Sequence, residues 1–452
     1  MRAASLFGLM LSLATCAMMS SAEEARAGMV YYVSMSGDDG APGTSEQPWR
    51  TVQKAADTAL AGDTVYLREG VYRGRVVVGN SGTPEAPITF AAYQGESATI
   101  DGEGIELHGR DGVFVVAERE CVTARGLRVI NSRATGIMIR ESRHVVVESC
   151  YTHDTADSGI GVWRSSDVLV KGNEVVRACN GGSQECITIA GSERVQVIGN
   201  HVHNRGEGPR GGEGIDAKDG CSNVLIRGNH VHETRLGIYV DAWKTHTQDI
   251  EVTQNMVHDC EGCGFAVASE RGGLVENVRF VNNIAYRNRS AGIMVAGWNG
   301  GWQHPIHNVE IINNTVYANG WEEHTWGGGI GVESSGAQGI VIRNNICSQN
   351  REWQIMDQVG GAETTIDRNL IDGFRGGANE TRGLNAVEGD PRFVSPETGD
   401  FQLQPGSPAI GAGSTQDTPQ ADFAGNPRQG AAPDIGAFEY SDASTGGAGQ
   451  SL

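Results

Sequence analysis

Two acids, a lysine and a tyrosine stand at matching places in two nearby segments of the chain, GGEGIDAKDG and RLGIYVDA. In the first segment, Asp216 and Lys218 alternate with apolar residues, and in the second, Tyr239 and Asp241 do so. Alternate side chains of a β-strand lie on one face, about 7 Å apart, and a paired strand lies about 4.8 Å away. The sequence therefore predicts that the four side chains form one outward-facing cluster.

This cluster suits the abstraction of a proton from carbon 5 of a uronate, a sugar whose carboxylate is attached to that carbon. The reaction builds negative charge on the carboxylate, so a cation must stabilise the charge and a base must take the proton. Lys218 is the predicted base, provided that desolvation or a nearby cation lowers its pKa from about 10.4. Tyr239 is the predicted second acid or base, and Asp216 completes the predicted catalytic set.

The acids of the two segments predict a site for Ca²⁺, because carboxylates on adjacent strands can hold this ion through oxygen. The predicted ligands are Glu213, Asp216, Asp219 and Asp241. The alternative is a surface ladder of salt bridges around Lys218, which would contribute little to stability. Neighbouring segments carry no such charges at these places, and three acids and a tyrosine exceed what one lysine needs for pairing, so a functional site is favoured.

Replacing an outward-facing lysine removes no core packing, and surface changes usually shift stability by about half a kcal/mol or less. We therefore expect Lys218→Ala to abolish turnover and leave folding intact. Two other interpretations stay open. Asp216 and Asp241 resemble the paired carboxylates of a glycosidase, although the hydrolase signatures NTD, DD and GHG are missing around them. The chain can also be a non-catalytic carbohydrate-binding or surface protein.

Aromatic and cationic residues flank the cluster and are candidates for binding a sugar polymer. Sugars stack on exposed aromatic rings, and arginine binds carboxylates through two parallel hydrogen bonds. The predicted substrate-binding residues are Arg140, Trp163, Trp243, Lys244 and Trp298. Each tryptophan could instead pack against a long turn.

A repeat positions these residues. It recurs about every 23 to 37 residues as TGIMIR, SGIGVW, ECITIA, EGIDAK, LGIYVD, CGFAVA, AGIMVA and GGIGVE. Apolar residues two apart indicate strands with one buried face. A second series, separated by about 26 to 31 residues, comprises Asn173, Asn200, Asn229, Asn255, Asn283, Asn314 and Asn345. Asparagine suits tight turns, and stacked amides can bond to one another. Strands without helices at this period predict a solenoid.

Together these repeats resemble the right-handed parallel β-helix family over roughly residues 65 to 375. The resemblance implies an all-β, right-handed parallel β-helix solenoid with an N-terminal helical cap. Within that family, polysaccharide lyases of the pectate lyase kind pair a catalytic lysine with an acidic calcium site. Asp216-Ala217-Lys218-Asp219 is also similar to the DPH(D/E) strand of mannuronan C5-epimerases. There Asp216 matches the family aspartate, and Lys218 and Ala217 stand where the family has His and Pro.

The resemblance thus implies a lyase that cleaves a uronate-containing polysaccharide by β-elimination, with a C5-epimerase as the alternative. His203, His232 and His258 each stand three residues after an asparagine of the series. Stacked histidines suggest zinc, although such a column is more often structural.

The two ends of the chain predict that the protein is exported and that additional segments cover the ends of the solenoid. Residues 1–27 are similar to a secretory signal peptide, so the protein is expected to be secreted, either extracellular or periplasmic. Residues 28–64 are expected to contain a cap helix, since Val52 to Leu60 has helical spacing and Gly62 ends it. Residues 65–375 would form the β-helix, 376–440 a C-terminal closing segment and 441–452 a disordered tail.

The formal net charge of −20 and the lack of a basic run exclude a nucleic-acid partner. An acidic protein can still bind an acidic polysaccharide where a cation or a local lysine neutralises the site. We expect such a partner, no membrane span after the signal peptide and a monomeric protein.

Overall fold

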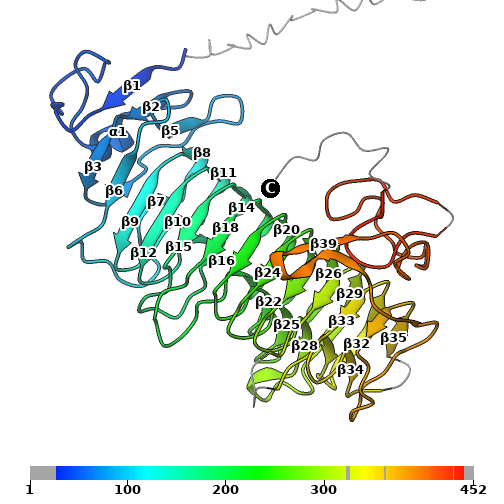
Figure 1. Ribbon diagram of the computed structural model, residues 1–452. Coiled ribbons are helices and arrows are strands. Elements are labelled where there is room, and N and C mark those ends of the chain that lie inside the picture. Colours follow the sequence, from blue (N-terminus) through cyan, green and yellow to red (C-terminus); the bar gives the residue numbers. More distant parts are fainter. Residues whose placement is uncertain (1–26, 322–325, 361–362, 431, 442–452) are drawn as a thin grey trace, which may run out of the picture.

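The computed structural model describes residues 27–321, 326–360, 363–430 and 432–441. It shows an elongated parallel β-solenoid in which each turn adds one strand to each of three sheets (Figure 1). Sheet 2 carries the predicted cluster and has eleven strands. They are β4 (Val76–Val77), β7 (Gly112–Ala117), β10 (Thr135–Arg140), β13 (Ile160–Trp163), β16 (Ile187–Ala190), β19 (Ile215–Lys218), β22 (Ile238–Ala242), β25 (Phe265–Ser269), β28 (Ile293–Ala296), β31 (Ile330–Val332) and β34 (Ile355–Asp357).

Sheets 1 and 3 form the other two sides and have thirteen strands each. Sheet 1 comprises β1 (Val30–Val33), β2 (Thr64–Leu67), β5 (Ile88–Ala92), β8 (Glu120–Arg125), β11 (Arg143–Glu148), β14 (Ser166–Lys171), β17 (Glu193–Ile198), β20 (Ser222–Arg227), β23 (Thr247–Thr253), β26 (Val275–Val281), β29 (Ile306–Ile312), β32 (Ala337–Arg343) and β35 (Thr364–Asp367). Sheet 3 comprises β3 (Gly70–Arg73), β6 (Ala98–Asp101), β9 (Arg128–Ser132), β12 (Tyr151–Thr155), β15 (Glu174–Val176), β18 (His201–His203), β21 (His230–His232), β24 (Met256–His258), β27 (Ile284–Tyr286), β30 (Thr315–Tyr317), β33 (Ile346–Ser348), β36 (Leu370–Asp372) and β37 (Val387–Glu388).

The alternation of apolar residues determines which face of each strand is buried. All eight copies of the predicted repeat form strands of sheet 2, and their apolar residues stack from one turn to the next, as in Ile137 beside Ile160. These side chains are fully buried in one continuous core that runs along the solenoid. The all-β fold and the predicted register are confirmed.

The asparagine series forms one buried column of hydrogen bonds, as predicted. Each Nδ2 donates to the Oδ1 of the next asparagine at 2.9 to 3.1 Å, from Asn173 as far as Asn369. Asn369 extends the expected series by one turn. A second, shorter column comprising Asn288, Asn319 and Asn350 was not predicted.

At the N-terminal end, helix α1 (Val52–Thr58) buries three small or apolar residues against the first turns and forms the expected cap. The Thr51 side chain accepts a hydrogen bond from the backbone N–H of Lys54 at 3.2 Å, which satisfies a free donor of the first helical turn. Strand β1 pairs with β2. Parallel pairing therefore begins before the expected residue 65, and at the other end it continues to β37.

The C-terminal segment folds back along the side of the solenoid. A two-stranded hairpin, β38 (Phe393–Ser395) and β39 (Asp400–Leu403), brackets the short helix η2 (Pro396–Thr398) and lies against sheet 3 (Figure 1). The ring of Phe401 lies 5.1 Å from that of Tyr286, and the ring of Phe393 lies 5.9 Å from that of Tyr317. Apolar contact with β27 and β30 thus holds this segment in place.

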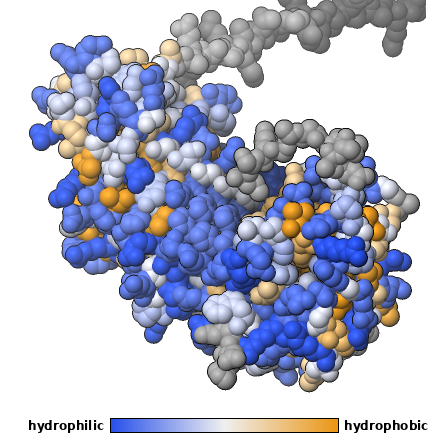
Figure 2. Space-filling model, in the orientation of Figure 1, coloured by the Kyte–Doolittle hydropathy of each residue, from blue (hydrophilic) through white to orange (hydrophobic). Residues whose placement is uncertain are grey.

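Two of the expected terminal segments lie largely outside the described residues. They are the signal peptide at 1–27 and the tail at 441–452. Within the described part, no helix has the length and apolar character needed to cross a membrane. The surface that Figure 2 shows is largely hydrophilic over the middle turns of the solenoid.

Candidate active site

Strands β19 and β22 are neighbours in sheet 2, and Asp216 pairs in register with Tyr239. The residues on either side, Ile215 and Ala217, are fully buried in the core. Asp216 and Lys218 therefore face outward, as the alternation predicted. Asp241 follows on β22, where its backbone carbonyl accepts a hydrogen bond from the N–H of Asp219.

The cluster is enclosed rather than lying in the open. Asp216 is 2% exposed, and Tyr239 and Asp241 are 5% exposed each. The side chain of Lys218 retains 17% exposure, which makes it the most accessible of the four. Loops that leave the neighbouring strands supply the cover, and two of them contribute acids that the sequence interpretation missed.

Glu185 is the first of these acids and the main partner of the lysine. Its Oε1 lies 2.5 Å from Lys218 Nζ, whereas the nearer carboxylate oxygen of Asp216 lies 3.9 Å away. The hydroxyl of Thr188 donates to the other oxygen of Glu185 at 2.8 Å. Glu185 opens the repeat copy ECITIA at the position that Glu213 holds in EGIDAK. That equivalence was the available signal for placing it beside the site.

Glu270 is the second missed acid. It follows β25, and its Oε1 accepts a hydrogen bond from the hydroxyl of Tyr239 at 2.8 Å. The ring of Trp298 lies 5.7 Å from the tyrosine ring and closes its other side. Burial, with the charges of Asp241 and Glu270, raises the pKa of Tyr239 well above its usual value, so this tyrosine carries its proton.

Charge at the site is dominated by the acids. Burial lowers the pKa of Lys218, but the charges of Glu185 and Asp216 outweigh it and hold the pKa above its usual value. The lowered pKa that Lys218 needs in order to act as a base is therefore not met by desolvation alone. Burial raises the pKa of Asp216 and of Asp241 well above the usual value.

The predicted calcium ligands fit such an ion in part. The Oδ1 atoms of Asp216 and Asp241 are both buried and have no hydrogen-bond partner among the residues that the structure describes, and a buried oxygen without a partner is costly unless something binds it. Asp219 differs, because its Oδ1 accepts from the backbone N–H groups of Lys244 and Thr245. In the described part of the chain, no three of the site carboxylates bring an oxygen each within 4.8 Å of one another.

The family of the chain follows from comparison with known proteins. The family model described as "Pel9A-like, right handed beta helix region" matches residues 31–324, more than half of the chain. The chain belongs to this family. The right-handed sense of the solenoid and the resemblance inferred from the repeats are thereby confirmed. A second family model, described as "Disaggregatase related", matches residues 275–376.

Two curated relatives are similar in sequence. The uncharacterized protein YwoF of Bacillus subtilis (strain 168) is 26% identical over 453 residues, which cover 86% of this chain and 94% of that protein. The pectate lyase PEL9 of Emericella nidulans is 34% identical over 140 residues, which cover 28% of this chain and 34% of that protein.

Solved structures of the same fold include other β-solenoids. Pectate lyase Pel9A superposes with a TM-score of 0.57 at 18% identity, over 92% of this chain and 97% of that one. The complex of XylC with xylose gives a TM-score of 0.59 at 14% identity, over 91% and 98%. The alginate lyase from Paenibacillus sp. str. FPU-7 gives 0.51 at 16% identity, over 67% and 99%. At these identities the likeness concerns the fold.

The residues predicted to bind substrate fall into two groups in this Pel9A-like chain. Trp243 is 41% exposed with the guanidinium of Arg271 5.0 Å from its ring, and Lys244 beside it is exposed. These residues follow Ala242, the last residue of β22, and offer an accessible surface next to the cluster. Trp298, at the start of the short helix η1 (Trp298–Gly300), packs on Tyr239 instead.

The other two predicted contacts lie two and three turns earlier on sheet 2. Arg140 pairs in register with Trp163 and is partly exposed. Trp163 is buried under the guanidinium of Arg110, which lies 4.2 Å from its ring. This packing leaves the tryptophan ring no open face for a sugar.

The site predicts an unusual pH dependence of stability. Burial, with the charge of Glu185, raises the pKa of Glu213 to about 7 from its ordinary value of 4.5. Between these values the folded chain holds a proton that the unfolded chain has released, so this contribution to stability is present at low pH and is lost as the pH rises through 7. In urea unfolding, Glu213→Gln should become more stable relative to wild type by roughly 3 kcal/mol between pH 4.5 and 8.

The matched control is Glu207→Gln, an exposed carboxyl of the same loop. Its stability difference from wild type should stay constant over this range. A flat difference for Glu213→Gln would show that Glu213 ionises normally in the folded protein.

Proposed function

We propose that this protein is a polysaccharide lyase that cleaves a uronate-containing polysaccharide by β-elimination. The observation that carries the proposal is Lys218 held outward among buried acids, with one free oxygen on each of Asp216 and Asp241. Such a set of groups exceeds what stabilising a strand requires. The names of the pectate lyase and alginate lyase relatives support the choice of substrate class.

In the proposed reaction, the C5 proton of the uronate moves to Nζ of Lys218 and the bond between carbon 4 and the glycosidic oxygen breaks. A double bond forms between carbons 4 and 5, and the leaving oxygen takes a proton from the hydroxyl of Tyr239. Lys218 must reach this step without its proton. Ca²⁺ at the free oxygens of Asp216 and Asp241 would stabilise charge on the substrate carboxylate and offset the acids that hold the lysine protonated.

Trp243 and Lys244 are the proposed contacts for the polymer beside the cluster. An exposed indole offers a stacking surface for a sugar ring, and an exposed ammonium attracts a uronate carboxylate. Arg140 is the proposed contact further along sheet 2. We also propose that the protein is secreted, that it acts as a monomer and that its partner is an acidic polysaccharide.

A substrate panel tests the function. Purified protein is mixed with pectate, alginate and glycosaminoglycans, with and without added Ca²⁺, and absorbance is followed at the wavelength of unsaturated uronates. We expect absorbance to rise on one polyuronate and the rise to depend on Ca²⁺. If NMR shows inversion of the configuration at carbon 5 and the absorbance does not rise, the protein is instead a C5-epimerase. Reducing ends without absorbance would identify a hydrolase, and binding without any product would identify a carbohydrate-binding protein.

A further inference from the structure

Sheet 3 carries a group of histidines on a different side of the solenoid from the acids of sheet 2. Three neighbouring strands place histidines next to a buried valine, so that the histidines face outward. The group consists of His201 and His203 on β18, His230 and His232 on β21, and His258 on β24. Each of the five is partly buried.

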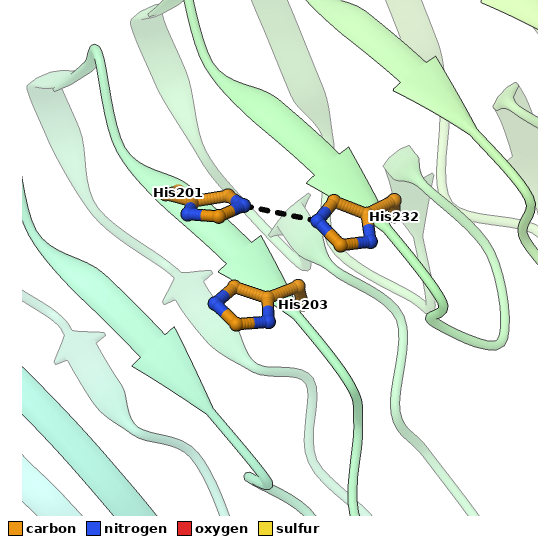
Figure 3. A group of neighbouring side chains, drawn as sticks. All are labelled: His201, His203 and His232. Atoms are coloured by element: carbon orange, nitrogen blue, oxygen red, sulfur yellow. Dashed lines mark hydrogen bonds between the residues drawn. The ribbon is translucent and has the colours of Figure 1, made fainter.

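Three of these side chains lie side by side, and His201 and His232 direct a ring nitrogen toward each other (Figure 3). The Nε2 atoms of His201 and His232 lie 3.0 Å apart, and one ring nitrogen from each of His201, His203 and His232 lies within 4.8 Å of the others. Imidazole nitrogens bind such an ion at about 2.1 Å. If the nitrogen–ion–nitrogen angle lies between the square-planar and the tetrahedral value, two ligand nitrogens lie about 3.0 to 3.4 Å apart. The spacing of the His201 and His232 nitrogens therefore matches one edge of a coordination shell.

The outer nitrogens of two rings are already engaged in ways that orient the rings. His203 Nδ1 lies 2.5 Å from the side-chain oxygen of Asn204, and His232 Nδ1 lies 3.5 Å from a carboxylate oxygen of Glu233. A proton on Nδ1 of His232 leaves its Nε2 lone pair free toward His201, whereas Nε2 of His203 faces Glu174. Histidines that bind metals are held in this way by an oxygen behind the ring.

The surroundings favour a cation. Glu174 lies 3.3 Å from His203 Nε2 and Glu233 lies behind His232. A cavity includes in its lining Asn204 and Glu233, which lie against His203 and His232.

We propose that His201, His203 and His232 bind one divalent transition-metal ion of the imidazole-preferring class, such as Zn²⁺ or Co²⁺. The ion joins two consecutive turns of the solenoid, because its ligands come from β18 and β21. An ion that binds only the folded chain raises the unfolding midpoint, and the rise grows with its concentration. This site is independent of the proposed lyase chemistry.

The test uses the full chain after treatment with a chelator and dialysis. Zn²⁺ is titrated by calorimetry, Co²⁺ binding is followed through its visible absorption, and the thermal midpoint is measured with and without Zn²⁺. Wild type should bind one equivalent, and the Co²⁺ bands should indicate nitrogen ligands. His232→Gln should weaken Zn²⁺ binding at least tenfold and remove the rise in midpoint.

Two control variants localise the ion. His153 occupies the same column as His203 on β12, but the neighbouring strands place Ile130 and Val176 beside it, so His153→Gln should bind Zn²⁺ as wild type does. His258→Gln alters the adjacent pair, in which His230 Nε2 lies 2.8 Å from His258 Nε2, and should change affinity less than threefold. A loss with His258→Gln equal to that with His232→Gln, or no saturable binding to wild type, would overturn the assignment.

Discussion

Replacing Lys218 with methionine is expected to lower turnover on the susceptible polyuronate by about 10²- to 10⁴-fold, the usual cost of losing a general base. The same change should lower the free energy of unfolding by about 3 kcal/mol, because it leaves a buried carboxylate without its partner. The second effect corrects the expectation that folding stays intact, since Lys218 Nζ lies 2.5 Å from Glu185 Oε1 and Glu185 is 4% exposed. Turnover and urea unfolding measure the two effects separately.

A double variant separates chemistry from folding. Glu185→Gln together with Lys218→Met removes both charges of the pair, so stability should recover in part while turnover stays low. Lys171→Met is the matched control, because Lys171 is exposed at the end of β14 on sheet 1. It should change neither property. If the double variant retains turnover within threefold of wild type, Lys218 is not the base and another group of the cluster must take the proton.

The solenoid itself could be predicted because its determinants are local and repeated. Alternating apolar residues such as Ile215 and Ala217 predict both the strand and its buried face. The spacing of the asparagines predicts where the chain turns. Matching the repeat copies then sets the stacking order, which places Asp216 beside Tyr239, as the structure confirms. The outward direction of the cluster needs no further information than this alternation.

The environment of the cluster could not be predicted in the same way. Glu185 and Glu270 stand 33 and 31 residues away from their partners. The repeat aligns Glu185 with Glu213 but does not show that its side chain reaches Lys218, and Glu270 lies in a loop after β25, where the repeat gives no guidance. Without these acids, burial is expected to lower the pKa of Lys218. The sign of the shift depends on whether opposite charge or desolvation is larger, and that balance is decided by the loops.

The fate of individual aromatic residues also depends on loops. Trp163 and Trp243 both lie at the ends of sheet 2 strands and are equivalent as candidates in the sequence. The structure buries Trp163 beneath Arg110 and leaves Trp243 exposed beside the site. An arginine lies over each ring, so the difference comes from the rest of the packing: Trp163 also belongs to a buried cluster with Met138 and Ala190, whereas Trp243 stays 41% exposed.

The asparagine column should account for a large part of the stability of the solenoid, and Asn255 lies in its middle. Asn255 Oδ1 accepts from both the backbone N–H and the side-chain amide of Asn229, at 2.9 Å each. Its own amide donates to the carbonyl of Ile226 and to Asn283. Asn255→Ala leaves two buried donors unsatisfied, and each costs about 1 to 3 kcal/mol, so we expect the free energy of unfolding to fall by about 3 to 5 kcal/mol.

Urea unfolding of two further variants provides a comparison for the loss of stability expected with Asn255→Ala. Asn173 begins the column, and its Oδ1 accepts only from the backbone N–H of Cys150 among the hydrogen bonds of the described residues, so Asn173→Ala should cost about half as much. Gln196→Ala changes an exposed amide on β17 and should stay within about 0.5 kcal/mol of wild type. The expected order of the losses in stability follows from the number of buried donors left unpaired, which is two for Asn255→Ala, one for Asn173→Ala and none for Gln196→Ala. Equal losses for Asn255→Ala and Gln196→Ala would mean that strand packing alone holds the turns together.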